Sequence, residues 1–172
     1  MSKKLFIPIC TFALLLLAAA LAFCNLPAET APAPDGADGA PDFSVVCTDG
    51  GTFSLSAHRG ETVVINVWAT WCGPCLTELP AFDRLQREKE NVAVLALHAQ
   101  PVTDDPAAFA AERGYAFAVA VAPDAALPAS LGAGQALPYT LIVAPDGTVA
   151  WRGTGALTYE KLAALTEEAA KK

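Results

Sequence analysis

The sequence predicts an α/β fold in which a central sheet is flanked by helices, and three observations support this class. Residues 62–68, TVVINVW, form a nearly continuous apolar run, which is typical of a strand buried on both faces of a sheet. A helical pattern of apolar residues begins directly after this run. Further strand and helix patterns then follow one another along the chain, as expected of this class.

A short antiparallel pair is expected before the central strand. Residues 42–47, DFSVVC, alternate between apolar and polar, and the Gly50-Gly51 pair turns the chain into TFSLS at 52–56. Cys47 shares the apolar face of the first segment. We therefore expect it to be a buried, inert thiol, with a second redox partner as the alternative.

The central strand leads into a helix. Pro74 stands where the first helical turn tolerates a missing N–H donor, and Cys75, Leu79, Phe82 and Leu85 recur at helical spacing. The two cysteines of the WCGPC motif are thus expected at a strand-to-helix junction.

The later strands and helices are predicted from the same apolar patterns. They are a strand over 91–97, a helix over 105–114, a weaker strand over 117–121, strands over 139–143 and 148–153 joined at Asp146-Gly147, and a helix over 159–170. His98 is expected in a loop at the end of its strand, with a proton-shuttle role as the alternative. His58 is expected in a loop and indicates no function.

The first 26 residues predict a signal peptide or membrane anchor. The basic start MSKK precedes an uninterrupted apolar stretch over 5–24, long enough as a helix to cross a bilayer. Three outcomes stay open: an uncleaved anchor, lipidation at Cys24, or cleavage near Ala20-Leu21-Ala22. All three place the rest of the chain outside the cytoplasm.

A linker and one domain follow. Residues 27–41 are rich in Ala, Pro, Gly and Asp and contain no aromatic side chain, which predicts a flexible tether. Residues 42–172 have the usual size of one domain. The chain of 172 residues has a formal net charge of −7 and no basic stripe, which argues against nucleic acid as a partner.

The pair Cys72 and Cys75 could be a redox dithiol, half of a zinc site or a structural disulfide. Zinc needs about four ligands, yet the domain otherwise offers only Cys47, His58 and His98. A bridge closing so short a loop adds little stability. A helix N-terminus lowers the pKa of a thiol placed there, which favours redox exchange with Cys72 attacking and Cys75 resolving. No metal or other cofactor is expected.

Several motifs together resemble a known family. The segment NVWATWCGPC, a helix interrupted by Pro80, LPYT before a strand and the PDG hairpin resemble the thioredoxin fold. More narrowly, residues 42–172 resemble the membrane-tethered TlpA/ResA-like thiol-disulfide oxidoreductases. The resemblance implies a central mixed sheet flanked by helices, with a short N-terminal antiparallel extension and an inserted strand-helix element.

The resemblance also implies a substrate groove beside the cysteines. Pro138 corresponds to the cis-proline of the family, and the backbone of Leu137 would pair with an extended substrate. Trp71 is expected to shield the disulfide, whereas Trp68 is expected in the core.

Other site residues follow from the same resemblance. Gly73 and Pro74 match the dipeptide of thioredoxin and are expected to tune the redox pair. Glu78 is expected to assist proton transfer near Cys75, with an ordinary exposed helical glutamate as the alternative. Asn66 stands where thioredoxin has a buried aspartate, and it could instead be only a hydrogen-bonded polar residue.

The expected function is reduction of disulfides in exported proteins at the bacterial cell envelope, with apocytochrome c as a possible substrate and a membrane thiol relay as electron donor. A thioredoxin-shaped holdase that uses the Leu137-Pro138 groove is the alternative from another class. A thiol peroxidase of the same superfamily is disfavoured, because Ile65 and Ala69 replace the Pro and Thr of the Pro-x-x-x-Thr-x-x-Cys pattern ahead of Cys72.

Overall fold

The computed structural model describes residues 39–172. The predicted anchor over 1–26 and the linker up to residue 38 lie outside the described residues. Within residues 39–172, no helix is both long enough and apolar enough to cross a membrane.

A five-stranded mixed sheet forms the centre of the domain, in the order β5-β4-β3-β6-β7. Its strands are β3 (Thr62–Trp68), β4 (Val92–His98), β5 (Ala118–Val121), β6 (Tyr139–Val143) and β7 (Val149–Thr154). Strand β3 pairs in parallel with β4 and antiparallel with β6, and all seven of its residues are buried. The prediction of 62–68 as the central strand is therefore confirmed.

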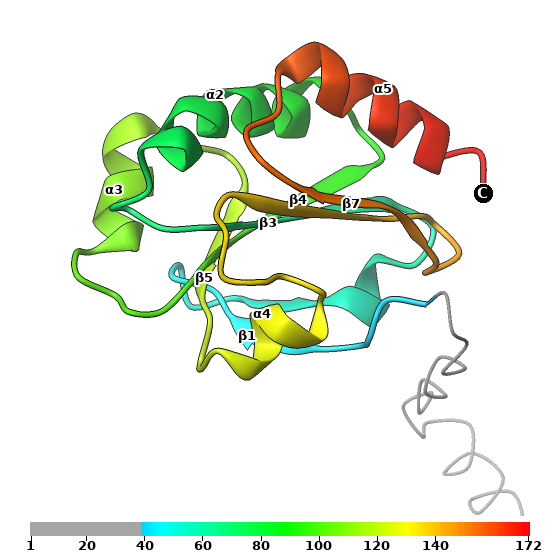
Figure 1. The fold of residues 1–172 in the computed structure, drawn as a ribbon. Helices are drawn as coiled ribbons and strands as arrows, with labels where there is room; N and C mark the ends of the chain where they lie inside the picture. Colours follow the sequence, from blue (N-terminus) through cyan, green and yellow to red (C-terminus); the bar gives the residue numbers. More distant parts are fainter. Residues whose placement is uncertain (1–38) are drawn as a thin grey trace, which may run out of the picture. The chain divides into compact units, whose positions relative to one another are not determined.

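Helices and smaller elements cover the two faces of this sheet (Figure 1). One face carries α2 (Gly73–Glu88), α3 (Pro106–Arg113) and α5 (Tyr159–Ala169). The other carries the hairpin β1 (Ser44–Val46) and β2 (Thr52–Ser54), the 3-10 turn η1 (Leu55–His58) and α4 (Ala126–Ser130). The antiparallel start was predicted. The elements η1 and α4 were not, because four- and five-residue elements are too short to show a periodicity.

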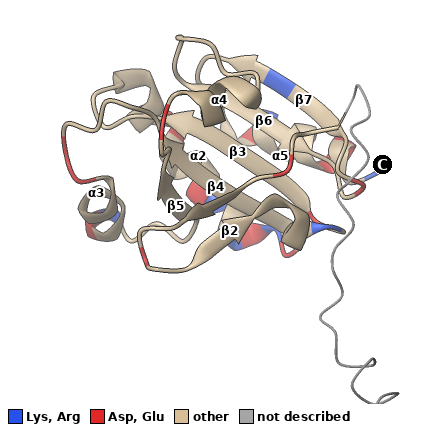
Figure 2. Ribbon diagram, turned by 90° about the horizontal axis from the view of Figure 1, so that it is seen from below, with Lys and Arg blue, Asp and Glu red and all other residues tan. Residues whose placement is uncertain are grey.

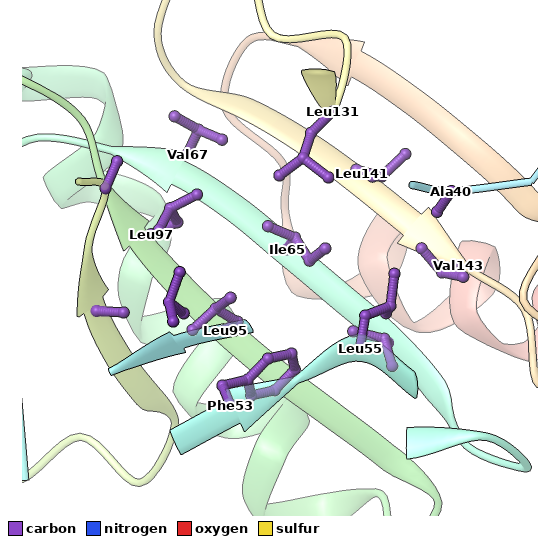
Figure 3. Packing of buried hydrophobic residues seen from close by; sticks show 14 of the residues in the cluster. Ala40, Phe53, Leu55, Ile65, Val67, Leu95, Leu97, Leu131, Leu141 and Val143 are labelled. Carbon is purple, nitrogen blue, oxygen red and sulfur yellow. The ribbon is translucent and has the colours of Figure 1, made fainter. Parts of the chain in front are cut away.

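Each face of the sheet has its own apolar core, because side chains alternate along a strand. Figure 3 shows Ile65, Leu95 and Leu97 of the sheet facing Phe53 and Leu55 from the β1–β2 side. These side chains are buried. They stabilise the face of the sheet that lies opposite α2.

The second core holds the first long helix in place. Leu79 and Phe82 of α2 are fully buried with Val64 and Ile142 of the sheet and Leu162 of α5. Helix α2 continues through Pro80 as one element, where the sequence had suggested an interruption. This packing sets the position of the N-terminus of α2, where the two cysteines lie.

The charged residues do not gather on one element. Figure 2 shows Asp and Glu residues in loops and helices around the domain, with Lys and Arg residues between them. Several form ion pairs at the surface, such as Arg84 with Glu88 and Arg87 with Asp83 within α2. Exposed pairs of this kind contribute little to stability.

Candidate active site

The two cysteines of the motif lie at the beginning of α2, as predicted. Cys72 is the N-cap residue and Pro74 lies in the first helical turn. Cys72 and Cys75 form a disulfide with their Cα atoms 5.3 Å apart, and the backbone N–H of Cys75 donates to the Sγ of Cys72 at 3.3 Å. When the bond is reduced, this N–H and the positive end of the helix dipole favour a thiolate on Cys72.

The two sulfur-bearing residues differ in access to solvent. Cys72 keeps 6% of its surface exposed, whereas Cys75 is fully buried. Because a substrate sulfur must reach the attacking thiol directly, this asymmetry favours Cys72 as the nucleophile and Cys75 as the resolving thiol.

Glu78 of α2 is buried, only 2% exposed. Its Oε1 accepts from the Nδ2 of Asn66 at 2.8 Å, and its Oε2 accepts from the backbone N–H of Leu157 at 2.8 Å. The alternative of an exposed helical glutamate is therefore wrong. Glu78 lies three residues after Cys75 in α2, a spacing that puts both side chains on one side of a helix.

Burial dominates the electrostatics of this carboxyl group. Loss of water around Glu78 raises its pKa to about 7, although the hydrogen bonds from Leu157 and Asn66 act in the opposite direction. A carboxyl group with such a pKa is partly protonated near neutral pH. It can therefore accept and return a proton in the range where thiols exchange with disulfides.

Asn66 connects this carboxyl group to the sheet. Its Nδ2 also donates to the Oγ1 of Thr140 at 3.2 Å, and the two residues are direct cross-strand partners of β3 and β6. The interpretation of Asn66 as a hydrogen-bonded polar residue is confirmed. Thr140 and the N–H of Leu157 were missed, since each meets the site only through the tertiary fold.

A cavity of about 380 Å³ adjoins the disulfide loop. Trp71 and Leu137 line it, together with residues in and after α4. Trp71 is 52% exposed, and its Nε1 donates to the carbonyl oxygen of Pro101 at 3.3 Å. The Leu137-Pro138 peptide bond is cis, as the resemblance implied, whereas the roles of these residues toward a substrate stay predictions.

The remaining candidate residues lie elsewhere. Cys47 is a buried free thiol in the core between the sheet and the β1–β2 hairpin, and burial raises its pKa, which agrees with an inert residue. His58 bonds Glu61 at the surface. The placement of His98 in a loop is wrong, because it is the fully buried last residue of β4. Trp68 is buried in the core, as predicted.

The described part of the chain contains no group of three or more His, Cys, Asp or Glu side chains able to hold a metal ion. A thioredoxin-like fold with a cysteine pair at the beginning of its first long helix defines the class of proteins that exchange dithiols with disulfides. The chain belongs to the Redoxin family, whose model matches residues 35–168.

Within the thioredoxin superfamily the chain is ResA-like. It is 31% identical over 157 residues to the thiol-disulfide oxidoreductase ResA of Geobacillus thermodenitrificans, covering 88% of this chain and 89% of that protein. A shorter match reaches 45% identity over 60 residues with the thioredoxin-like protein YneN of Bacillus subtilis, about a third of either chain.

A solved structure has the same fold as this domain. The pneumococcal exposed lipoprotein thioredoxin Etrx1 of Streptococcus pneumoniae superposes with a TM-score of 0.65 at 25% identity, over 73% of this chain and 98% of that one. The thioredoxin-like fold, with its mixed central sheet and flanking helices, is therefore established for the domain.

Proposed function

We propose that this protein is an extracytoplasmic thiol-disulfide oxidoreductase that reduces disulfides of exported proteins. The observation that carries the proposal is the pairing of a partly accessible Cys72 at the N-terminus of α2 with a fully buried Cys75. The relatives named thiol-disulfide oxidoreductases support the same reaction.

The reaction proceeds in two exchanges. The Cys72 thiolate attacks one sulfur of the substrate disulfide, a mixed disulfide forms, and the other substrate sulfur leaves as a thiolate that takes up a proton. Cys75 then loses its proton, and its thiolate attacks the Sγ of Cys72; the bond between Cys72 and the substrate breaks, and the substrate sulfur leaves as a thiolate that takes up a proton. The products are the reduced substrate and the Cys72–Cys75 disulfide, which a dithiol donor must reduce again.

Glu78 serves the second exchange. A buried thiol is a weak acid, since burial disfavours its thiolate. The carboxylate of Glu78, on the same side of α2 as Cys75, takes this proton directly or through one water, and the hydrogen bonds from Asn66 and Leu157 hold it in place.

The location outside the cytoplasm rests on two supports. The first is the basic start and apolar stretch over residues 5–24. The second is the likeness to Etrx1, which is described as an exposed lipoprotein. We propose a membrane thiol relay as the electron donor and exported proteins, apocytochrome c among them, as substrates.

Reduction of insulin by the purified protein in the presence of dithiothreitol tests the activity. We expect turbidity from the released B chain with the wild type and none above background with Cys72→Ser. Equal turbidity from both proteins, or none from either, would reject the oxidoreductase. Retained binding of unfolded protein by Cys72→Ser, without any reductase activity in the wild type, would point to a holdase.

Capture of covalent partners identifies the substrates. Cys75→Ser leaves the mixed disulfide on Cys72 unresolved, so partners stay attached through a bond that dithiothreitol releases. Cys72→Ser/Cys75→Ser is the matched control. If the captured proteins contain no disulfide bond when they are oxidised, the proposed substrate class is contradicted.

A further inference from the structure

His98 is a buried titratable side chain that the mechanism above does not use. It ends β4, where it lies between Trp68 of β3 and Val121 of β5 in the sheet register. The ring is fully buried and packs edge-on against the indole of Trp68, with the ring centres 5.1 Å apart.

The ring contacts the loop that carries the attacking cysteine. The backbone N–H of Thr70, two residues before Cys72, donates to the Nε2 of His98 at 3.0 Å. A backbone N–H can only donate, so Nε2 must be the unprotonated nitrogen. In this geometry His98 is therefore neutral and carries its proton on Nδ1.

The Oγ1 of Thr70 also lies 3.5 Å from the Nε2 of His98, and two hydrogen bonds between other groups join the same two segments. The N–H of Ala99 donates to the carbonyl of Trp68 at 2.8 Å, and the Nε1 of Trp71 donates to the carbonyl of Pro101 at 3.3 Å. The end of β4 and the residues after it thus hold the segment that leads from β3 to Cys72. Among the partners in these three bonds, the imidazole of His98 is a group that can change its charge by taking up a proton.

We propose that His98 is a positioning residue for disulfide exchange: its neutral ring holds Thr70 and the following Trp71-Cys72 segment in the reactive arrangement, and protonation of the ring releases it. The proposal rests on the proposed thiol-disulfide exchange and adds a residue and a pH dependence to it.

Protonation would put an N–H on Nε2, directly opposite the N–H of Thr70. Two donors facing each other cannot form a hydrogen bond, so the N–H of Thr70 loses its acceptor, which is costly for a buried group. The nearest acceptor for the new N–H is the Oγ1 of Thr70, 3.5 Å from Nε2, and a bond to it would reposition Thr70. The N–H of Cys72 donates to the carbonyl of Ala69 at 3.1 Å and closes these four residues into one turn, so a displacement of Thr70 within the turn reaches Cys72.

The surroundings of the ring favour its neutral form. Burial lowers the pKa of His98, whereas a hydrogen bond with the backbone of Ala99 and the charge of Asp104, in the segment before α3, oppose this shift. Trp68 from β3 and Val121 from β5, which flank the ring in the sheet, carry no charge. Phe109 from α3 packs on Trp68 and is also uncharged. Protonation of the ring therefore needs a lower pH than protonation of an exposed histidine does.

The test compares the reduced wild type with His98→Gln and His98→Phe between pH 5 and 8. Gln can present an acceptor oxygen near the position of Nε2 but does not titrate in this range, whereas Phe fills the space without an acceptor. The measurement is the rate at which 4,4′-dithiodipyridine reacts with Cys72, divided at each pH by the thiolate fraction determined from ultraviolet absorbance. Because this reagent replaces the protein substrate, the result is independent of whether exported proteins are reduced.

We expect the normalised wild-type rate to fall at acidic pH and the His98→Gln rate to stay constant. The normalised rate of His98→Phe should be roughly five- to tenfold lower than that of the wild type at pH 8, the loss that one missing hydrogen bond corresponds to, and independent of pH. Superimposable profiles of wild type and His98→Gln would overturn the proposal. If near-ultraviolet circular dichroism shows that His98→Phe does not fold, the comparison of wild type with His98→Gln tests the proposal by itself.

Discussion

At the scale of the residue, Glu78 shows how burial changes the acidity of a common side chain. A glutamate on a solvated helix surface stays ionised at neutral pH. The same group between Asn66 and the N–H of Leu157 loses most of its contact with water, and its pKa rises to about 7. Its proton is then exchanged near neutral pH, as the role proposed for it beside Cys75 requires.

Glu78→Gln is expected to slow resolution of the mixed disulfide and to change the pH dependence of exchange. The amide is nearly isosteric but cannot take the proton of Cys75, so the step assigned to a group with a pKa of about 7 should disappear from the profile. The rate of exchange with a peptide disulfide, measured from pH 5 to 9, checks this. Identical profiles for the two proteins would remove Glu78 from the mechanism.

The same carboxyl group should make stability depend on pH. Its pKa in the folded protein lies above the value of 4.5 that it has when exposed, so the folded state holds the proton more tightly than the unfolded state does. The free energy of unfolding should therefore fall as pH rises from about 4.5 to about 7, by up to about 3 kcal/mol from this group.

Urea unfolding of oxidised wild type and Glu78→Gln at pH 4.5, 6 and 7.5 measures this effect. We expect wild type to lose stability relative to Glu78→Gln as pH rises through this interval. A constant difference between the two proteins would mean that Glu78 titrates as an exposed carboxyl group.

At the scale of the element, α2 places the two thiols in different surroundings. Cys72 caps the helix, where the dipole and the N–H of Cys75 stabilise a thiolate, whereas Cys75 is inside the first turn and fully buried. Leu79 and Phe82 anchor the following turns in the core. The helix therefore leaves one sulfur partly accessible and keeps the other buried, as the proposed two-step exchange requires.

Brief treatment of the reduced protein with iodoacetamide should alkylate Cys72 well before Cys75. The reason is that alkylation needs both a thiolate and access for the reagent, and only Cys72 has both. Mass spectrometry of tryptic peptides after short exposure distinguishes the sites, with urea-unfolded protein as the control in which both should react. Preferential labelling of Cys75 in the folded protein would reverse the assignment.

The dipeptide between the cysteines should make the protein a reductant. Gly73 and Pro74 add no charge beside Cys72, so the thiolate is stabilised mainly by the helix, as in thioredoxin with a potential of about −270 mV rather than in the oxidant DsbA with about −120 mV. Equilibration of the Cys72–Cys75 pair with glutathione measures the potential. A value near that of DsbA would contradict the proposed direction of electron flow.

At the scale of the whole molecule, the sheet separates a core that positions the active site from a core that stabilises the domain. Side chains of β3 alternate between the two, so Val64 packs on the α2 side and Ile65 on the side of the β1–β2 hairpin. Substitutions in the second core should therefore change stability more than they change the chemistry of the cysteines.

Leu55→Ala is expected to lower the free energy of unfolding by about 2–5 kcal/mol, the usual loss for a buried leucine. Leu55 is buried on the face opposite α2, so the rate of alkylation of Cys72 in the folded protein should change by less than about twofold. Urea unfolding and the iodoacetamide assay give the two values. Val46→Ala, at a position 72% exposed, is the matched control and should change stability by no more than about 0.5 kcal/mol. A large loss of Cys72 reactivity in folded Leu55→Ala would show that the two cores are coupled.

The sequence by itself determined the elements whose pattern is local. The apolar run over 62–68 specified a central strand, the spacing after Pro74 specified a helix, and WCGPC at their junction specified a redox pair. These inferences succeed because periodicity and the position of a helix N-terminus depend on neighbouring residues alone.

Tertiary structure alone decided the surroundings of that pair. Glu78 is buried because it meets Asn66 from β3 and a backbone N–H 79 residues away, and His98 reaches Thr70 across 28 residues. Neither contact leaves a local pattern. Burial and pKa are sums over every element that packs around a group, so they are determined only when strands and helices distant in the sequence are brought together.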